Sequence, residues 1–515
     1  MVTTRIGRDA GAAWLALAAS AVVVASWMVW QPHTADLAAQ VYREGLFERV
    51  GWTLWDNNWF GGHHVPGYSL LTPWLMAQAG IAVTGAVAAL TTTVAFAAIA
   101  RALGSQRWRW ATVWVAWAAT GDLLIGRVTY AVGLALAVVA VLAIVRRWPT
   151  FAACVLGALC AAASPVAGLF LATAVLIWWT FEHRHAMLAV AASSVTVTIG
   201  CALLFGDGGA QPYSLSAAAL AIAITVALWA GVAPDARLAR RALLVYAVIV
   251  AASWLLPTPM GSNVARLGVA FALPVALLAR HRISRAYIPV VGVAAAAWLV
   301  FAPVTEVAKS LDAPETRAGY YAPLLAQLKQ RGATAGRVEV VPSATRWETV
   351  YVGERYLLAR GWETQLDRAE NSLFYAAHLD GARYVRWLRS NAVRFVALSR
   401  APKERWGRAE EQLLRHGVGG VRLAWASRNW RIYAVYAPQP LVSGARVTHM
   451  GADRIVLRIA SPATVVLRVR WSRYWHGDPG VSIARRRDGF MNVTAPRAGR
   501  VVLHVSLLSA RTVAG

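Results

Sequence analysis

Long apolar runs separated by short polar turns fill the first three hundred residues of the chain. A helix that crosses a bilayer needs about 20 mostly apolar residues, with some slack for tilt and partial burial. Runs of this kind cover residues 12–31 and 69–100, and the second is long enough for a short interfacial helix plus a span. The other runs are 110–125, 128–145, 150–164, 166–181, 186–205, 214–232, 242–257, 264–280 and 286–303. The pattern predicts a polytopic α-helical membrane protein with about eleven transmembrane helices.

Two details of this pattern leave alternatives open. Arg5 and Arg8 precede the first run, as in a signal peptide, but the many later spans favour a retained anchor. The two runs that meet at Ser164-Pro165 are short, so they are either full crossings or a broken pair of half-length helices. A polar, aromatic-rich loop over 32–68 follows the first run.

The pattern changes after residue 303. Strand-like runs at 338–341, 393–398 and 431–435 alternate with amphipathic helical stretches at 320–331 and 405–416, which predicts an α/β-like domain over 304–438. From about residue 439 the runs alternate with period two, which predicts a small β-rich unit over 439–515. Its predicted strands are 454–459, 464–471 and 500–507.

Composition supports the membrane assignment. The 515 residues are 58% hydrophobic and only 15% charged, with mean hydropathy +0.47, whereas soluble domains average about 25% charged. The net charge of +26 comes almost entirely from arginine, and no nucleic-acid-binding motif accompanies it, so nucleic acid is not an expected partner. Cys154, Cys160 and Cys201 all lie in apolar runs, which argues against a disulfide framework or a cysteine metal site.

Arginine placement predicts the orientation, because Arg and Lys concentrate in cytoplasmic loops. With the N-terminus inside, the predicted inner turns hold arginine clusters. These are Arg101, Arg107 and Arg109; Arg146 and Arg147; Arg184; Arg237, Arg240 and Arg241; and Arg280, Arg282 and Arg285. The outer connections hold Arg43, Arg49, Arg127 and Arg266. The loop 32–68 after the first span then lies on the extracytoplasmic side, and an odd number of spans places the region 304–515 there as well.

The outer loop carries the strongest candidates for chemistry. Asp36 lies only a few residues past the first span, and Asp56, His63 and His64 follow in an aromatic-rich stretch. A carboxylate at the membrane face can act as a general base on an acceptor hydroxyl. With a neighbouring Asp or His it can instead hold a divalent cation that neutralises a phosphate leaving group. For Asp36, helix capping or an ordinary surface charge is the alternative, and interfacial Trp and Tyr need no function at all.

Further polar residues fall on the same predicted face. Asp122 and Arg127 flank a turn, and Asn263 and Arg266 begin another apolar run. An arginine at the end of a span commonly extends to the interface for structural reasons. The same guanidinium is a permanent forked cation suited to phosphate oxygens, so Arg127, Arg266 and Asn263 are candidate ligands of a lipid-linked phosphate, with His63 and His64 as further substrate contacts.

These features resemble the GT-C superfamily of integral-membrane glycosyltransferases: an early outer loop with Asp36, about eleven spans and an outer C-terminal domain. The stretch from Trp55 to Tyr68 also looks like loops in bacterial membrane proteins of this type. The resemblance implies transfer of a hexosyl or pentosyl group from a polyprenyl-phosphate donor to a cell-envelope glycan or lipid. It implies that Asp36 serves as base or metal ligand. Many members have a second acid beside the first; here Leu37 follows, and Asp56 is the candidate substitute.

Two other classes fit the same pattern. A transporter or flippase also has many spans, although such proteins usually carry interrupted helices in corresponding halves and ionisable residues near the membrane midplane. A non-catalytic scaffold for envelope assembly would need none of Asp36, Arg127 or Arg266. The sugar, the acceptor, the linkage and any metal requirement stay open at this stage.

Overall fold

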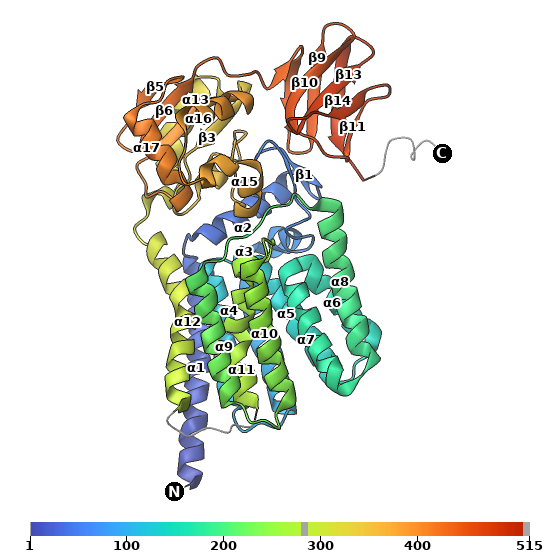
Figure 1. The fold of residues 1–515 in the computed structure, drawn as a ribbon, viewed down its shortest axis with the longest axis vertical. Coiled ribbons are helices and arrows are strands. Elements are labelled where there is room, and N and C mark those ends of the chain that lie inside the picture. The colour runs from blue at the N-terminus through green and yellow to red at the C-terminus, as the bar shows by residue number, and fades with distance from the viewer. Residues whose placement is uncertain (1, 280–286, 508–515) are drawn as a thin grey trace. The chain divides into compact units, whose positions relative to one another are not determined.

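The computed structural model describes residues 2–279 and 287–507, which form two compact units (Figure 1). Unit 1 contains the described residues of 1–45 and 67–311, and unit 2 contains those of 46–66 and 312–515. Unit 1 is helical, and unit 2 combines short helices with three four-stranded sheets and a two-stranded hairpin. The predicted arginine cluster at 280–285 lies outside the described residues.

The helices of unit 1 follow the predicted apolar runs closely. In chain order they are α1 (Val2–Trp30), α2 (Ala35–Val50, whose last turns belong to unit 2), α3 (Thr72–Ala102), α4 (Trp108–Ile125), α5 (Val128–Val145), α6 (Thr150–Ala163), α7 (Pro165–Glu182), α8 (His185–Phe205), α9 (Leu215–Gly231), α10 (Arg237–Leu255), a 3-10 turn η1 (Gly261–Val264), α11 (Ala265–Leu278) and α12 (Tyr287–Ser310). Among the described residues, eight helical stretches are long and apolar enough to cross a membrane, and α6 and α9 are shorter apolar helices. The chain is therefore a multi-pass membrane protein.

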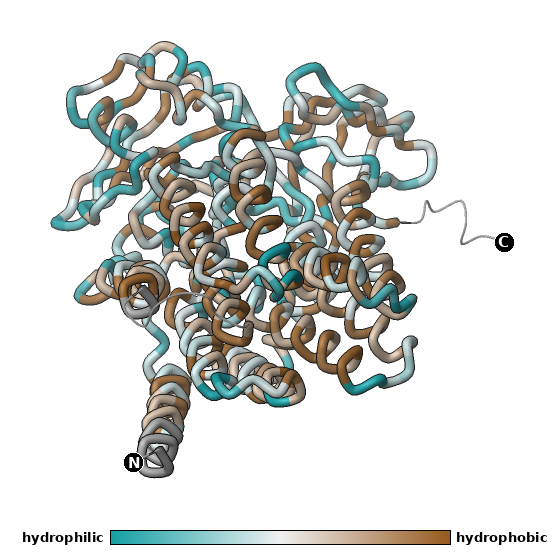
Figure 2. Tube along the Cα trace, turned by 60° about the horizontal axis from the view of Figure 1, so that its bottom comes forward, coloured by the Kyte–Doolittle hydropathy of each residue, from teal (hydrophilic) through white to brown (hydrophobic). Residues whose placement is uncertain are grey.

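The outward surfaces of these helices are apolar, the reverse of a water-soluble bundle. Leu15 is 73% exposed, Val29 92% and Phe151 78%. Figure 2 shows hydrophobic residues along the length of the helices and hydrophilic ones concentrated in turns. Because exposed apolar surface of this extent is costly in water, its natural environment is lipid.

Two breaks in the helices have local causes. Gly80 has φ 78° and ψ 152°, a conformation open to glycine, and it divides α3 into a short first segment and a long second one, as the run 69–100 predicted. At Ser164 the backbone is extended, Pro165 begins α7, and the Ser164 hydroxyl accepts a hydrogen bond from the Ala167 N–H. The two runs are thus separate helices that meet at Ser164-Pro165; α7 is long and apolar enough to cross a membrane, whereas α6 is a shorter apolar helix.

The predicted loop 32–68 needs a correction, because residues 35–50 form helix α2. Apolar and charged residues are mixed along this helix without a dominant apolar stripe, so hydropathy alone did not reveal it. The helix places Asp36 in its first turn, where a carboxylate interacts favourably with the helix dipole.

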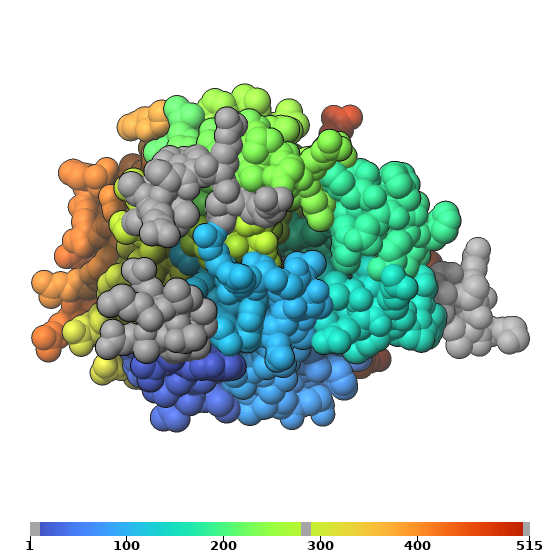
Figure 3. Space-filling model, turned by 90° about the horizontal axis from the view of Figure 1, so that it is seen from below, coloured from blue at the N-terminus to red at the C-terminus, as the bar shows by residue number. Residues whose placement is uncertain are grey.

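The turns that join the helices of unit 1 fall into two sets at opposite ends of the bundle. Figure 3 views the end that carries the α3–α4, α5–α6, α7–α8 and α9–α10 turns, in light blue, cyan and green. The described arginine clusters predicted to be cytoplasmic belong to this end. The other end carries the α4–α5 turn, the α6–α7 break and the start of α11, where the candidate residues lie.

Unit 2 contains an α/β part with the sheet order β3-β4-β6-β5. Strands β3 (Arg337–Val340) and β4 (Val393–Ser399) are parallel, whereas β6 (Trp430–Val435) and β5 (Val421–Ala426) are antiparallel additions. The predicted strands at 338–341, 393–398 and 431–435 and the predicted helices at 320–331 and 405–416 are confirmed. The helices of this part are α13 (Ala318–Gln330), α14 (Glu348–Tyr351), α15 (Thr364–Glu370), α16 (Gly381–Ser390) and α17 (Arg408–His416).

A β-sandwich completes unit 2. One sheet has the order β12-β13-β10-β7 and the other β11-β14-β9-β8, and every pairing is antiparallel. Inward side chains such as Leu457, Leu467 and Leu503 are fully buried between the sheets. The strands are β7 (Val442–Ser443), β8 (Arg446–Met450), β9 (Arg454–Ile459), β10 (Ala463–Arg470), β11 (Trp475–Gly477), β12 (Ser482–Arg485), β13 (Phe490–Ala495) and β14 (Gly499–Val505).

Candidate functional site

An ion-paired cluster lies where α2 begins and α4 gives way to α5. Arg127 Nε contacts Asp36 Oδ2 at 3.0 Å, and Arg127 Nη1 contacts Asp122 Oδ1 at 3.4 Å. The side chains of Arg127 and Asp36 are 24% and 26% exposed and that of Asp122 11%, so the cluster is shielded but reachable. Burial lowers the pKa of Arg127, but the two carboxylates outweigh burial and hold that pKa above its usual value, so the guanidinium stays charged.

Local backbone geometry brings Asp36 to Arg127. Gly126 ends α4 at φ 89°, and a Cβ on it would lie 2.5 Å from the backbone N of Leu37. Only glycine permits both the left-handed turn and this close approach of the α2 backbone. The Thr34 hydroxyl donates to the Ile125 carbonyl at 2.5 Å, which fixes the start of α2 on the end of α4. Residues 91 positions apart thus become an ion pair.

Arg266 joins the cluster from the first turn of α11. Its guanidinium lies over the ring of Tyr130, with Cζ 5.1 Å from the ring centroid, and it interacts electrostatically with Arg127, Asp36 and Asp122. Asn263 lies in η1, the 3-10 turn that leads into α11, and is half-buried. The structure therefore gathers Asp36, Arg127 and Arg266, with Asn263 three residues before Arg266.

A hydrogen-bonded layer beside this cluster was not predicted from the sequence. Gln40, one helical turn after Asp36, accepts from the Thr129 hydroxyl at 2.5 Å and donates to the Tyr68 hydroxyl at 3.2 Å. Arg43 lies over the Tyr68 ring at 3.5 Å. The only sequence signal for Gln40 is its i+4 spacing from Asp36, which puts both on one face of α2.

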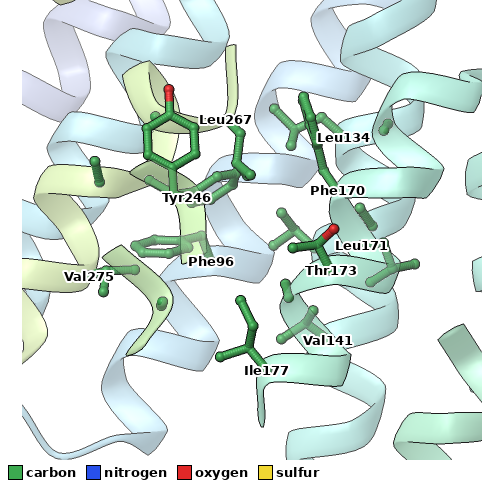
Figure 4. A pocket seen from close by; sticks show the side chains of 18 of the residues that line it. Phe96, Leu134, Val141, Phe170, Leu171, Thr173, Ile177, Tyr246, Leu267 and Val275 are labelled. Carbon is green, nitrogen blue, oxygen red and sulfur yellow. The ribbon is translucent and has the colours of Figure 1, made fainter. Parts of the chain in front are cut away.

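A cavity of about 230 Å³ opens among helices α3, α5, α7, α10 and α11 of unit 1. Figure 4 shows its walls, with Phe96, Tyr246 and Leu267 on one side and Phe170 and Leu171 on the other. Nearly all of its lining side chains are apolar. Leu267 directly follows Arg266, and Leu134 lies one helical turn after Tyr130, so the cavity begins one turn below the charged cluster.

Asp56, His63 and His64 belong to unit 2, where they form a small hairpin. Strands β1 (Trp55–Asp56) and β2 (His63–His64) pair antiparallel, and Asp56 is fully buried, accepting from the Asn58 N–H at 3.0 Å. His63 stacks on Trp59 with ring centroids 5.6 Å apart, and His64 contacts the Ser472 hydroxyl at 2.9 Å. These contacts are typical of residues that hold a fold together.

The hairpin connects the two parts of unit 2. The Leu358 N–H donates to the Asn58 carbonyl at 2.7 Å, on the α/β side, and the Arg470 N–H donates to the Gly61 carbonyl at 2.8 Å, on the β-sandwich side. Trp59 is fully buried between these contacts. The aromatic residues of this stretch, for which the sequence suggested an interfacial position, include Trp55 and Trp59, which pack inside unit 2.

The donor set near Asp36 does not fit a resident metal ion. Asp36 and Asp122 share one arginine, and within residues 2–279 and 287–507 no three His, Cys, Asp or Glu side chains are grouped to hold a cation.

This chain was compared with known protein families, curated proteins and solved structures. No model of a known protein family matches it, and no curated protein matches it in sequence. Among solved structures it is similar to AftD, an arabinofuranosyltransferase from mycobacteria determined by single-particle cryo-EM, with 16% identity and a TM-score of 0.47. The similarity covers 87% of this chain and 41% of AftD, so the chain spans about two fifths of the length of that protein.

Proposed function

We propose that the chain is a membrane glycosyltransferase that takes its sugar from a polyprenyl-phosphate donor. The observation that carries the proposal is the charged cluster of Asp36, Arg127 and Arg266 at the head of an apolar cavity. A polyprenyl-phosphate sugar has the same division, with an anionic head on a long hydrocarbon tail. The orientation proposed from the arginine clusters places this site on the extracytoplasmic side.

The cluster is suited to a phosphate. Arg127 uses its Nε–H and one Nη1–H for the two carboxylates, which leaves three N–H groups on Nη1 and Nη2 to donate to a phosphate. Arg127 immediately precedes α5 and Arg266 lies in the first turn of α11, so two helix N-termini add positive potential to two guanidinium groups. Forked arginine donors match the oxygens of a phosphate.

The cavity is suited to the hydrocarbon tail. Burial of each methylene gains about 0.8 kcal/mol, so even two or three isoprene units in such a cavity contribute substantially to affinity. Gly268 lines the cavity where a Cβ would lie 2.2 Å from the Tyr246 hydroxyl, so the absence of a side chain there lets α10 and α11 approach.

Asp36 is then the proposed general base. It would accept the proton of an acceptor hydroxyl as that oxygen forms a bond to the anomeric carbon of the donor sugar. The bond from that carbon to the phosphate oxygen breaks, and the polyprenyl phosphate leaves with the electron pair. Arg127 and Arg266 would stabilise the charge that develops on the leaving phosphate. Envelope glycan or lipid is the proposed acceptor class.

Binding of the leaving group tests this site directly. Purified full-length protein in zwitterionic nanodiscs would be titrated with undecaprenyl phosphate and with undecaprenol, which lacks the phosphate, and the bound lipid counted by native mass spectrometry. We expect a clear preference for the phosphate, and a loss of about tenfold or more for Arg127→Gln or Arg266→Gln, since a hydrogen bond to a charged group contributes about 1.5–3 kcal/mol.

Arg237→Gln is the matched control, because Arg237 is an exposed arginine at the start of α10, at the opposite end of the same bundle. It should leave the preference unchanged. Equal affinity of the wild-type protein for the phosphate and the alcohol, or equal losses in all three variants, would refute the proposed phosphate site.

A further inference from the structure

The outer face of one β-sandwich sheet carries an unusual concentration of cations. Strands β8, β9 and β14 align Arg446, Arg458 and Arg500 as direct cross-strand neighbours. A second row aligns Arg454, His504 and His476 across β9, β14 and β11. The four arginines are exposed and the two histidines half-exposed. These six residues are called the basic sheet face below.

The strands that form the basic sheet face carry no acidic residue of their own. The sequences of β8, β9, β11 and β14 contain no Asp or Glu. Two acids flank these strands: Asp453 Oδ2 accepts from the Thr53 hydroxyl at 2.9 Å, and Asp478 Oδ2 accepts from the Val502 N–H of β14 at 2.7 Å. Four arginines against these two flanking carboxylates leave the face with an excess of positive charge that can attract an external anion.

The alignment of these arginines lowers the stability of the folded β-sandwich. Like charges directly opposite each other on neighbouring strands repel, and Arg446, Arg458 and Arg500 form three in a row. Neighbouring positions in such a row are about 5 Å apart, and Arg454 and Arg458 are separated by about 13 Å along β9. A ligand with several spaced negative charges would relieve this repulsion at more than one point.

The other side chains on these strands argue against a membrane or a nucleic acid as the ligand. Among the described residues, the large exposed hydrophobic side chains include none on β8, β9, β11 or β14. The face therefore offers no large apolar anchor for a bilayer and no exposed Trp, Tyr or Phe ring on which nucleic-acid bases could stack. The Thr448 hydroxyl, which donates to the Val456 carbonyl at 3.1 Å, and the imidazole rings of His476 and His504 add hydrogen-bonding groups suited to hydroxyls.

We propose that the basic sheet face binds an acidic glycan, a polysaccharide that carries repeated carboxylate or phosphate groups. The ligand lies across β8, β9 and β14 and pairs its anionic groups with Arg446, Arg458 and Arg500. This inference stands apart from the transfer reaction, because none of its residues belongs to the cluster around Asp36.

The inference is tested by measuring binding of two polysaccharides, acidic polygalacturonate and neutral dextran, to the full chain in zwitterionic nanodiscs. We expect salt-sensitive binding of polygalacturonate and none of dextran. The triple variant Arg446→Gln/Arg458→Gln/Arg500→Gln should weaken binding roughly tenfold, since it removes three exposed charge pairs with the ligand and each such pair contributes modestly. Its thermal stability should equal or exceed that of the wild type, because the repulsion is gone.

The control variant Arg422→Gln/Arg428→Gln/Arg431→Gln removes the same charge from exposed positions in the α/β part of unit 2. It should bind as the wild type does. Equal weakening by both triple variants would show a net-charge effect and overturn the proposal. So would absence of polygalacturonate binding, or equal or tighter wild-type binding to vesicles containing 30% phosphatidylglycerol or to oligothymidylate.

Discussion

At the scale of single residues, the ion pair around Asp36 and the carboxylates inside the α/β part of unit 2 differ in burial. Asp36 and Arg127 are about a quarter exposed and pair across the start of two helices. In unit 2, by contrast, Glu339, Glu348 and Glu410 are almost fully buried. A reachable ion pair can exchange partners with a ligand, whereas a buried carboxylate affects mainly the stability of the fold.

Glu348 gives a pH prediction. It accepts hydrogen bonds from the Ser343 N–H and hydroxyl, yet burial raises its pKa to about 7. A raised pKa means that the folded state binds the Glu348 proton more tightly than the unfolded state does. The stability that this proton contributes is therefore complete below the unfolded-state pKa near 4.5, and it is lost as the pH rises through 7. The Glu348→Gln variant should therefore become more stable than the wild type at pH 8, by up to about 3 kcal/mol, and not at pH 4.5.

Thermal unfolding of unit 2 in the full-length protein, followed from pH 4.5 to 8, measures this difference. Burial also raises the pKa of Glu410 to about 7, so the variant keeps part of the pH dependence. Glu411→Gln is the control, since Glu411 pairs with Arg415 at 2.8 Å near the surface. A Glu348→Gln curve parallel to that of the wild type would contradict the prediction.

How far the sequence could predict the site is also a matter of single residues. Asp36, Arg127 and Arg266 were expected on one face because span counting alone assigns a side to each. Their mutual contact depends on Gly126 and Thr34, whose roles follow from packing between α2 and α4 rather than from any motif. Asp56 and His63 have side chains suited to catalysis or metal binding. They are buried because distant parts of the chain, around Leu358 and Arg470, pack against their hairpin.

At the scale of elements, the apolar helices were predictable because lipid demands long apolar runs. Helix α2 was not, since its residues show no continuous apolar stripe. The strands β8 and β12 escaped prediction for a related reason: they are short and mostly exposed. Longer strands such as β9 and β14, with one face buried, showed the expected alternation.

Gly126 controls how α2 meets the α4–α5 turn. Gly126→Ala would put a Cβ within 2.5 Å of Leu37 N at φ 89°, so we expect loss of thermal stability and of phosphate binding. Gly104→Ala is the control, because Gly104 has φ 70° but open space around it, and its cost should be only about 1 kcal/mol. Similar melting temperatures for the two variants would show that the close approach is unimportant.

If the cavity binds the hydrocarbon tail of the donor, a change in its lining should weaken binding of long-chain donors without affecting recognition of the phosphate head. Ala174 lines it, and Ala174→Trp would exclude at least two methylenes of a bound tail, which corresponds to roughly tenfold weaker binding of a long-chain donor. A donor with a short, water-soluble chain should be unaffected. Ala219→Trp on α9, exposed and outside the cavity, should change neither. Equal effects on long-chain and short-chain lipids would place the tail elsewhere.

At the scale of the whole molecule, the proposals depend on which side of the membrane each part of the chain lies. Single cysteines at Gln106 in the α3–α4 turn, Ser216 at the start of α9 and Ser427 in unit 2 would be labelled with a membrane-impermeant maleimide. In intact cells we expect labelling of Ser216→Cys and Ser427→Cys, and labelling of Gln106→Cys only after permeabilisation. The wild-type chain, with its own three cysteines, is the background control. Labelling of Gln106→Cys in intact cells, with Ser427→Cys protected, would reverse the proposed orientation.

Transfer itself is the most direct test of the central claim. Purified protein in nanodiscs would receive radiolabelled polyprenyl-phosphate hexose or pentose together with an envelope glycan extract, and the labelled glycan would be measured. Wild-type protein should transfer one of these sugars, and Asp36→Asn should lose at least about a hundredfold in rate while still binding undecaprenyl phosphate. Asp235→Asn, an exposed control at the other end of the bundle, should remain active. Full activity of Asp36→Asn, or sugar-lipid flux across vesicles with no labelled glycan, would contradict the account.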